Sequence, residues 1–356
     1  MLPHSKIISH LARGYVLVVV VVFAMSSLFA AEVTETKSGG TVAIIDTHAH
    51  ISRGYRRGRA LPGAAVPQAL RAMDDLRVEM TILLPPPFPP GHPGIYGLRE
   101  LEPVARANPG RFAFVAGGES LNPMIHRVAP DKVTPDVIRE FQQEAESIVK
   151  AGAAGFGELT AEHFSFGQGG HPYESTRPDH LLLLALADIA AQHRMPIDLH
   201  MEAVPQDMPF PGRLAGGANP SVLKENLAKF ERLLAHNRKA KIIWAHAGWD
   251  NTGERTLGLM RRLLMENPNL YMSIKIDPGP RPNRPLDKSD AAEMRWVELL
   301  QDFPERFIIG SDQFFDEGTD RLALARKFVD ALPPDVARLV AQENAKSIYR
   351  IEAKRK

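Results

Sequence analysis

The sequence predicts an α/β protein, a single-domain (β/α)8 TIM barrel that follows an N-terminal signal segment. Short apolar runs typical of buried strands recur eight times, and helical patterns lie between them. Regular alternation of strands and helices predicts a parallel sheet, and eight such units predict a closed barrel of about 250 residues or more. A doubly wound open sheet is the alternative, but no Gly-x-Gly-x-x-Gly motif follows the first strand.

The predicted strands are short runs of apolar residues bounded by polar or turn-forming residues. Such runs are consistent with strands that are buried on both faces of a sheet. In chain order they cover residues 43–45, 81–84, 112–116, 154–158, 197–200, 242–246, 270–274 and 307–310.

The clearest helix prediction covers residues 134–150. Thr134 and Pro135 are typical of a helix start, because threonine caps free amide groups and proline fits the first turn. Gly152 then ends the pattern. Five further helical patterns cover residues 179–194, 219–236, 252–266, 289–301 and 320–332.

The N-terminal region has the plan of a secretory signal. Basic residues precede an apolar run at 15–25, and small residues follow it. The run is shorter than the roughly 20 residues that span a bilayer, although an uncleaved membrane anchor is the alternative. We therefore expect a signal peptide at 1–31, a polar linker at 32–41 and the folded domain at 42–351, in a periplasmic or secreted protein.

Composition excludes several classes of protein. The chain is 44% hydrophobic and 24% charged, a balance typical of a globular protein. The formal net charge is +1 without a dense basic block, so nothing indicates a nucleic-acid surface. Cysteine is absent, which excludes disulfides, thiolate metal sites and thiol nucleophiles. A metal ion would have to be held by histidines and carboxylates.

Five of the predicted strands end in, or are followed directly by, a potential metal ligand. The first strand continues into Asp46-Thr-His48-Ala-His50, and alternation along a strand places both histidines on one face. The later strands supply Glu158, His200, His246 and Asp312. Such groups would be costly to bury together without an ion, so their recurrence at one end of the barrel predicts a metal site. We expect Asp46 to orient a ligand histidine.

Three long connections, at 52–68, 85–99 and 277–288, follow predicted strands. In a barrel they lie at the carboxyl ends of the strands, where active sites are built. His92, His163 and His171 are expected in loops on this face. Because arginine grips carboxylates with two parallel hydrogen bonds, we expect at least one of four basic residues to bind an acidic substrate: Arg53, Arg56, Arg177 and Lys275.

These motifs resemble those of the amidohydrolase superfamily. The resemblance covers residues 42–350 and is carried by Asp-Thr-His-Ala-His, Ile-Asp-Leu-His, Ile-Trp-Ala-His-Ala-Gly, Ile-Gly-Ser-Asp and the terminal Glu-Asn-Ala-Lys-Ser-Ile-Tyr. They are most similar to the amidohydrolase-related branch, which includes carboxymuconate-semialdehyde decarboxylases and lactone hydrolases. The resemblance implies one or two divalent ions, with zinc expected.

The resemblance leaves the number of ions open. In the decarboxylase-like pattern, one ion is bound by four residues and His246 is free to act as an acid or base; the four are His48, His50, His200 and Asp312. In the two-ion pattern, Glu158 bridges, and His200 with His246 holds the second ion. Relatives with a carboxylated lysine on the fourth strand differ, because this chain has glutamate there.

The function expected first is a metal-dependent hydrolase that acts on a C–N or C–O bond, such as an amide or lactone. A bound divalent ion lowers the pKa of water toward about 7, and the resemblance implies that Asp312 takes and returns the proton. A non-oxidative decarboxylase is the alternative, and a metal-binding envelope protein without catalysis is the third. The expected partner is a small molecule, and a homo-oligomer is compatible with the sequence.

Overall fold

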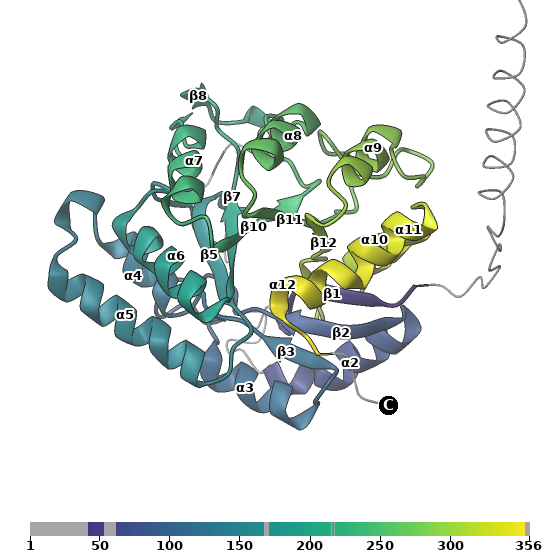
Figure 1. Cartoon of the computed structure of the whole chain (residues 1–356), viewed down its shortest axis with the longest axis horizontal. Coiled ribbons are helices and arrows are strands. Elements are labelled where there is room, and N and C mark those ends of the chain that lie inside the picture. The colour runs from purple at the N-terminus through teal and green to yellow at the C-terminus, as the bar shows by residue number, and fades with distance from the viewer. Residues whose placement is uncertain (1–41, 53–61, 167–170, 215, 217, 353–356) are drawn as a thin grey trace, which may run out of the picture. The chain divides into compact units, whose positions relative to one another are not determined.

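The computed structural model (Figure 1) describes residues 42–52, 62–166, 171–214, 216 and 218–352. The described residues from Val42 onward form one compact unit. The predicted signal peptide and linker therefore lie outside the described residues, as do Arg53 and Arg56. Among the described helices, none has the length and apolarity that crossing a bilayer requires.

The described strands form an α/β fold with two mainly parallel sheets. One sheet has the order β13-β1-β2-β3, and the other has the order β12-β11-β10-β7-β5-β4, with β6 added antiparallel to β5. A short antiparallel pair, β8-β9, stands apart. The bounds are β1 (Ile44–His50), β2 (Val78–Leu83), β3 (Phe112–Phe114), β4 (Ala116–Gly117), β5 (Phe156–His163), β6 (Glu174–Ser175), β7 (Pro196–Met201), β8 (Met208–Pro209), β9 (Val222–Leu223), β10 (Lys241–Ala247), β11 (Leu270–Ile274), β12 (Phe307–Ile309) and β13 (Gln313–Phe314).

All eight apolar runs of the sequence contribute strands, but the strands do not join into one sheet in the described residues. The third run is divided into β3 and β4 by Val115, and β13 follows β12 after three residues. Each of these divided runs has one part in each sheet. The two sheets are also linked directly, because Thr47 Oγ1 of β1 donates to Ile309 O of β12 at 2.7 Å.

The helices lie around the strands in Figure 1, except α12, which lies near the middle of the view. They are α2 (Pro62–Asp75), α3 (Leu98–Ala107), α4 (Leu121–Arg127), α5 (Pro135–Lys150), α6 (Leu181–His193), α7 (Leu227–His236), α8 (Leu257–Glu266), α9 (Met294–Asp302), α10 (Asp320–Asp330), α11 (Pro334–Arg338) and α12 (Asn344–Tyr349). Helix α5 begins as predicted, because Thr134 Oγ1 accepts from Val137 N.

The predicted start of α7 was wrong by several residues. Asn219 and Pro220 do not open the helix, because the chain first pairs β9 with β8. The Asn226 side chain then accepts from Val204 N at 3.0 Å and donates to Glu202 O at 2.8 Å. These bonds tie residue 226 to the end of β7, and the helix begins only at Leu227.

A small apolar cluster joins the two sheets at one level. It contains side chains from four strands and the β3–β4 junction, together with the last helix: Ile45, Ile82, Val115, Ile243, Ile308, Ile348 and Tyr349. Each of these side chains is at most 6% exposed. A larger cluster packs the outer helices against the strands. The strands thus share a buried apolar level, and His50, His200 and His246 lie near the carboxyl ends of β1, β7 and β10.

Candidate metal centre

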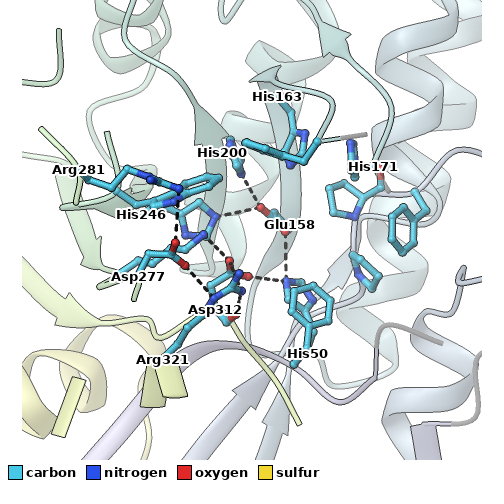
Figure 2. Close-up of a pocket in the computed structure, with 17 residues that line it drawn as sticks. His50, Glu158, His163, His171, His200, His246, Asp277, Arg281, Asp312 and Arg321 are labelled. Atoms are coloured by element: carbon cyan, nitrogen blue, oxygen red, sulfur yellow. Dashed lines mark hydrogen bonds and ion pairs between the residues drawn. The ribbon is translucent and has the colours of Figure 1, made fainter. Parts of the chain in front are cut away.

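Glu158 on β5 contacts four histidines, and Figure 2 shows three of them, His50, His200 and His246. Its Oε1 is 2.9 Å from His200 Nδ1 and 3.2 Å from His246 Nε2. Its Oε2 is 3.4 Å from His50 Nε2 and 3.6 Å from His48 Nε2. The two oxygens of one carboxylate thus face two different pairs of imidazoles.

Asp312 approaches the same centre from the loop between β12 and β13. Its Oδ1 lies 3.2 Å from His50 Nε2, while its Oδ2 accepts from Lys275 Nζ at 2.6 Å and from Arg321 Nη1 at 3.1 Å. Burial opposes the charged form, but Lys275 and Arg321 hold the pKa of Asp312 well below its usual range. Asp312 therefore stays ionised at the centre.

The backbone adopts a constrained conformation at two residues of the centre. His246 (φ 66°) and Asp312 (φ 55°) adopt the left-handed conformation, which is unfavourable for residues other than glycine and is often found at active sites. At Gly310 a Cβ atom would lie 2.9 Å from His48 Cβ. Glycine there lets β12 approach β1 closely, and this brings Asp312 alongside His48 and His50.

Charges at the centre are strongly coupled. Burial disfavours ionised Glu158, but interactions with His48, His200 and His246 hold its pKa well below the usual value. Burial also disfavours protonated His48, yet Asp198 and Glu158 raise its pKa well above the usual value. Burial and the Lys275 ammonium lower the pKa of His246. The pKa shifts of these groups are therefore set by one another as well as by burial.

The residues fit a divalent metal ion. Three groups of residues could each hold an ion, because the ligand atoms within each group lie within 4.8 Å of one another. The groups are His48, His50 and Glu158; His48, His246 and Asp312; and Glu158, His200 and His246. His48 Nε2 is buried and has no hydrogen-bond partner among the described residues, as expected of a nitrogen that faces an ion. Imidazole and carboxylate groups suit zinc, manganese, iron or nickel.

The sequence did not reveal which carboxylate orients His48. Asp46 was expected in this role, but its carboxylate accepts from Ser311 Oγ at 2.5 Å and from Ser311 N at 2.8 Å. The ring of His48 instead contacts Asp198, whose Oδ2 lies 3.2 Å from His48 Nδ1. Asp198 stands two residues before His200 on β7. Because alternate residues of a strand point to the same side, the sequence could have indicated that Asp198 faces the ligand histidines.

The histidines of the centre open into a cavity of about 330 Å³, a size suited to a small molecule. Figure 2 shows His163 and His171 on one side and Arg281, Arg321 and Asp277 on the other. The aromatic residues of the wall are Phe88, Phe166, Trp249 and Phe314, and Pro86 and Pro87 come from the proline-rich connection. His163 was expected in a loop, but β5 extends to it through pairing with β6.

The structure separates the basic residues that were considered as substrate ligands. Lys275 lines the cavity, where its ammonium lies 3.3 Å from the centre of the Trp249 ring. Arg177 lines a different cavity, and its guanidinium pairs with Asp179 at 2.9 Å. Arg281, which the sequence reading missed, lines the same cavity as Lys275. Its place depends on the path of the 277–288 connection, which sequence alone does not reveal.

The sequence of residues 45–351 matches the amidohydrolase family. The chain belongs to the amidohydrolase family. The resemblance predicted from the motifs is therefore confirmed, and the α/β fold with parallel sheets agrees with membership in this family. No curated protein sequence matches this amidohydrolase.

Several solved structures are similar to this amidohydrolase. One is 2,6-dihydroxybenzoate decarboxylase with 2,6-dihydroxybenzoate (13% identity, 87% of this chain and 100% of that chain, TM-score 0.47). Another is 5-carboxyvanillate decarboxylase from Novosphingobium aromaticivorans with manganese (14% identity, 87% and 96%, TM-score 0.48). A third is amidohydrolase 2 from Bifidobacterium longum subsp. infantis (13% identity, 88% and 100%, TM-score 0.44).

Proposed function

We propose that this amidohydrolase is a metal-dependent hydrolase that cleaves an amide-type or lactone-type bond in a small substrate. The position of Glu158 carries the proposal, because each of its oxygens faces a different pair of histidines. A carboxylate between two histidine pairs suits two adjacent ions, an arrangement that hydrolytic enzymes use. This favours the two-ion pattern over the one-ion pattern of a decarboxylase.

In this proposal, one ion is held by His48, His50 and Asp312, and the other by His200 and His246. Glu158 is shared between them. When bound, the ions supply Lewis acidity toward water and toward the oxygen of the bond to be cleaved.

Asp312 is proposed as an anionic ligand and as the proton acceptor in hydrolysis. Its Oδ2 is held by Lys275 and Arg321, so a proton can be accepted only through Oδ1, which faces His50. The two cations keep the carboxylate ionised and fixed in one orientation. Lys275 contacts Asp312 and the ring of Trp249. We therefore assign it to holding Asp312 rather than to binding the substrate.

We propose that Arg281 recognises an anionic group on the substrate. It lines the cavity, and its Nε is buried without a hydrogen-bond partner among the described residues. Its nearest carboxylate, Asp277, lies 3.5 Å away and is shared with Arg321 at 3.1 Å. Arg281 is therefore less committed to protein partners than Lys275, and a carboxylate on the substrate would satisfy its free donor.

We also propose that the two sheets are parts of one closed (β/α)8 barrel. At the first gap, Ala154 N, just before β5, donates to Phe114 O of β3 at 2.8 Å. At the second gap, Thr47 Oγ1 of β1 donates to Ile309 O of β12 at 2.7 Å. These bonds and the apolar cluster shared by both sheets support closure.

The test is the metal content per chain of the full-length protein, purified without chelators, for the wild type and Glu158→Gln. We expect two ions in the wild type and one in the variant. Glu162→Gln is the matched control, because Glu162 is also buried on β5 but accepts from Ser175 rather than from a ligand histidine. The control should keep both ions.

Activity distinguishes the remaining outcomes. One ion in both proteins, together with CO₂ release from hydroxybenzoates, would support the decarboxylase in place of the hydrolase. Hydrolysis of N-acyl amino acids or lactones by the two-ion protein would support the proposal. The absence of bound metal from the wild type under metal-replete conditions would overturn it.

A further inference from the structure

We propose that two carboxylates of the β7 segment, Asp198 and Glu202, fix the tautomers of His48 and His200 in opposite senses, while His246 has no such partner. The two ion positions of the centre therefore differ in affinity. This inference rests on the proposed metal site, and it assigns a positioning role to residues that do not themselves face an ion.

Alternation along β7 places Asp198, His200 and Glu202 on the same side of the chain, with Glu202 one residue beyond the strand end. All three side chains are nearly inaccessible, at 1%, 3% and 3% exposure. Buried carboxylates are costly unless they are paired. Each of these two carboxylates has a ligand histidine within ion-pair distance.

Asp198 acts on a histidine of another strand. Its Oδ2 lies 3.2 Å from His48 Nδ1, and this is the ion pair that Asp198 makes among the described residues. When Nδ1 carries the proton and donates it to Asp198, the lone pair of His48 is on Nε2. That nitrogen is the one that faces Glu158 and Asp312.

Glu202 acts on its neighbour in the opposite sense. His200 turns Nδ1 toward Glu158 at 2.9 Å, which leaves Nε2 facing Glu202 Oε1 at 3.9 Å. Glu202 is held in place by Asn251 Nδ2, which donates to the same oxygen at 2.6 Å. The proton of His200 is thus favoured on Nε2 and the lone pair on Nδ1. Because 3.9 Å is longer than a hydrogen bond, this contact should be weaker than that of Asp198.

The two remaining histidines differ sharply. His50 Nδ1 lies 3.0 Å from Leu84 O, which fixes its proton there and its lone pair on Nε2. His246 faces Glu158 through Nε2, but its Nδ1 is buried and has no hydrogen-bond partner among the described residues. The protein therefore leaves the tautomer of His246 unspecified.

The contrast predicts one tight and one weaker ion. The position formed by His48, His50 and Asp312 has two firmly oriented imidazoles and its own carboxylate. The position formed by His200 and His246 has one loosely oriented imidazole, one unoriented imidazole and only the shared Glu158. Loss of a group that orients a metal ligand typically costs about 10- to 100-fold in metal affinity, so an affinity difference of that order is expected.

The test is calorimetric titration of the full-length, metal-stripped protein with Zn²⁺ and, separately, with Co²⁺. The wild type should bind two ions with different dissociation constants. Asp198→Ala should weaken the tighter ion by about 10- to 100-fold, and Asp198→Asn should restore part of the loss because an amide oxygen still accepts from Nδ1. Glu202→Ala should weaken the second ion alone, by a smaller factor.

The matched control is Asp250→Asn. Asp250 is a buried carboxylate, but its partners are the main-chain amides of Thr252, Gly253 and Arg255 and the side chains of Thr252 and Asn283 rather than an imidazole. The Asp250→Asn variant should bind both ions with the affinities of the wild type. Thermal unfolding of each metal-stripped variant shows whether it is folded before titration.

A second measurement needs no substitution. Long-range ¹H–¹⁵N spectra of the zinc-bound wild type, with ¹⁵N-labelled histidine, should show His48 protonated on Nδ1 and His200 protonated on Nε2. The same tautomer at both positions would overturn the inference. So would equal affinities for the two ions, or an Asp198→Ala variant that binds the tighter ion as the wild type does. A wild type that binds no ion would instead overturn the proposed function.

Discussion

The strands have two levels of opposite character. At the level of Ile45, Ile82, Ile243 and Ile308, apolar side chains from both sheets pack with Tyr349 of α12. Further along, β1, β5, β7 and β10 carry histidines and a glutamate that are also buried. The first level gains free energy from burial, whereas the second must offset the cost of desolvating charges. The comparison teaches that stability and chemistry are separated along the strands rather than between domains.

The substitution with the largest expected effect disrupts the polar level of the strands. Asp312→Asn removes the anionic ligand that Lys275 and Arg321 keep ionised. Metal ions supply several kcal/mol of transition-state stabilisation, so we expect activity to fall about 1,000-fold, at about 1.4 kcal/mol for each factor of ten. The measurement is kcat/KM on the best hydrolytic substrate, with Asp250→Asn as the control. A loss below tenfold would contradict the role of Asp312.

The next substitution tests the apolar level. Ile308 is fully buried, and replacing a buried isoleucine by alanine costs about 2–5 kcal/mol of unfolding free energy because a cavity remains. Ile308→Val should cost only about 0.5–1.5 kcal/mol. Urea denaturation of the metal-stripped protein measures both changes. If the levels are separate, both variants bind the same number of ions as the wild type. A lost ion in Ile308→Val would show that the levels are coupled.

Arg281→Met tests a charged residue that lines the cavity and is proposed to bind an anionic group of the substrate. A hydrogen bond to a charged group contributes about 1.5–3 kcal/mol, so KM for a carboxylate-bearing substrate should rise about 10- to 100-fold. The KM for the corresponding uncharged amide should change little, since it has no anion for Arg281 to bind. Equal KM changes for the two substrates would remove Arg281 from substrate recognition.

The smallest expected effect concerns a buried acid beside the centre. Burial raises the pKa of Glu162 to about 7, above its value of 4.5 in the unfolded chain. The folded protein therefore holds this proton more tightly, and stability is lost as pH rises from about 4.5 through 7. Glu162→Gln should be more stable than the wild type at pH 8, by about 1–2 kcal/mol, and equally stable at pH 4. Thermal unfolding at the two pH values measures the difference, and no gain at pH 8 would contradict it.

Much of the fold could be predicted because strands buried on both faces are continuous apolar runs. The residues that follow those runs, such as His48, Glu158 and Asp312, could be predicted to meet because parallel strands end together. The tautomer-setting contacts could not, because the pairing of Asp198 with His48 depends on strand order and ring rotation. That Arg281 rather than Arg177 lines the cavity likewise depends on loop paths. The start of α7 was missed because a side-chain tether at Asn226 overrode local propensity.

The Lys275 ammonium lies against the ring of Trp249, so the fluorescence of Trp249 should respond to ligands that enter the cavity. Of the three tryptophans in the chain, Trp249 is the one that lines the cavity, and Trp244 and Trp296 are fully buried. An indole's emission energy responds to nearby charge, and here a cation lies 3.3 Å from the ring centre. Any ligand that draws Lys275 away or adds charge beside it will shift the emission of Trp249, so occupancy of the cavity can be followed by fluorescence before a substrate is known.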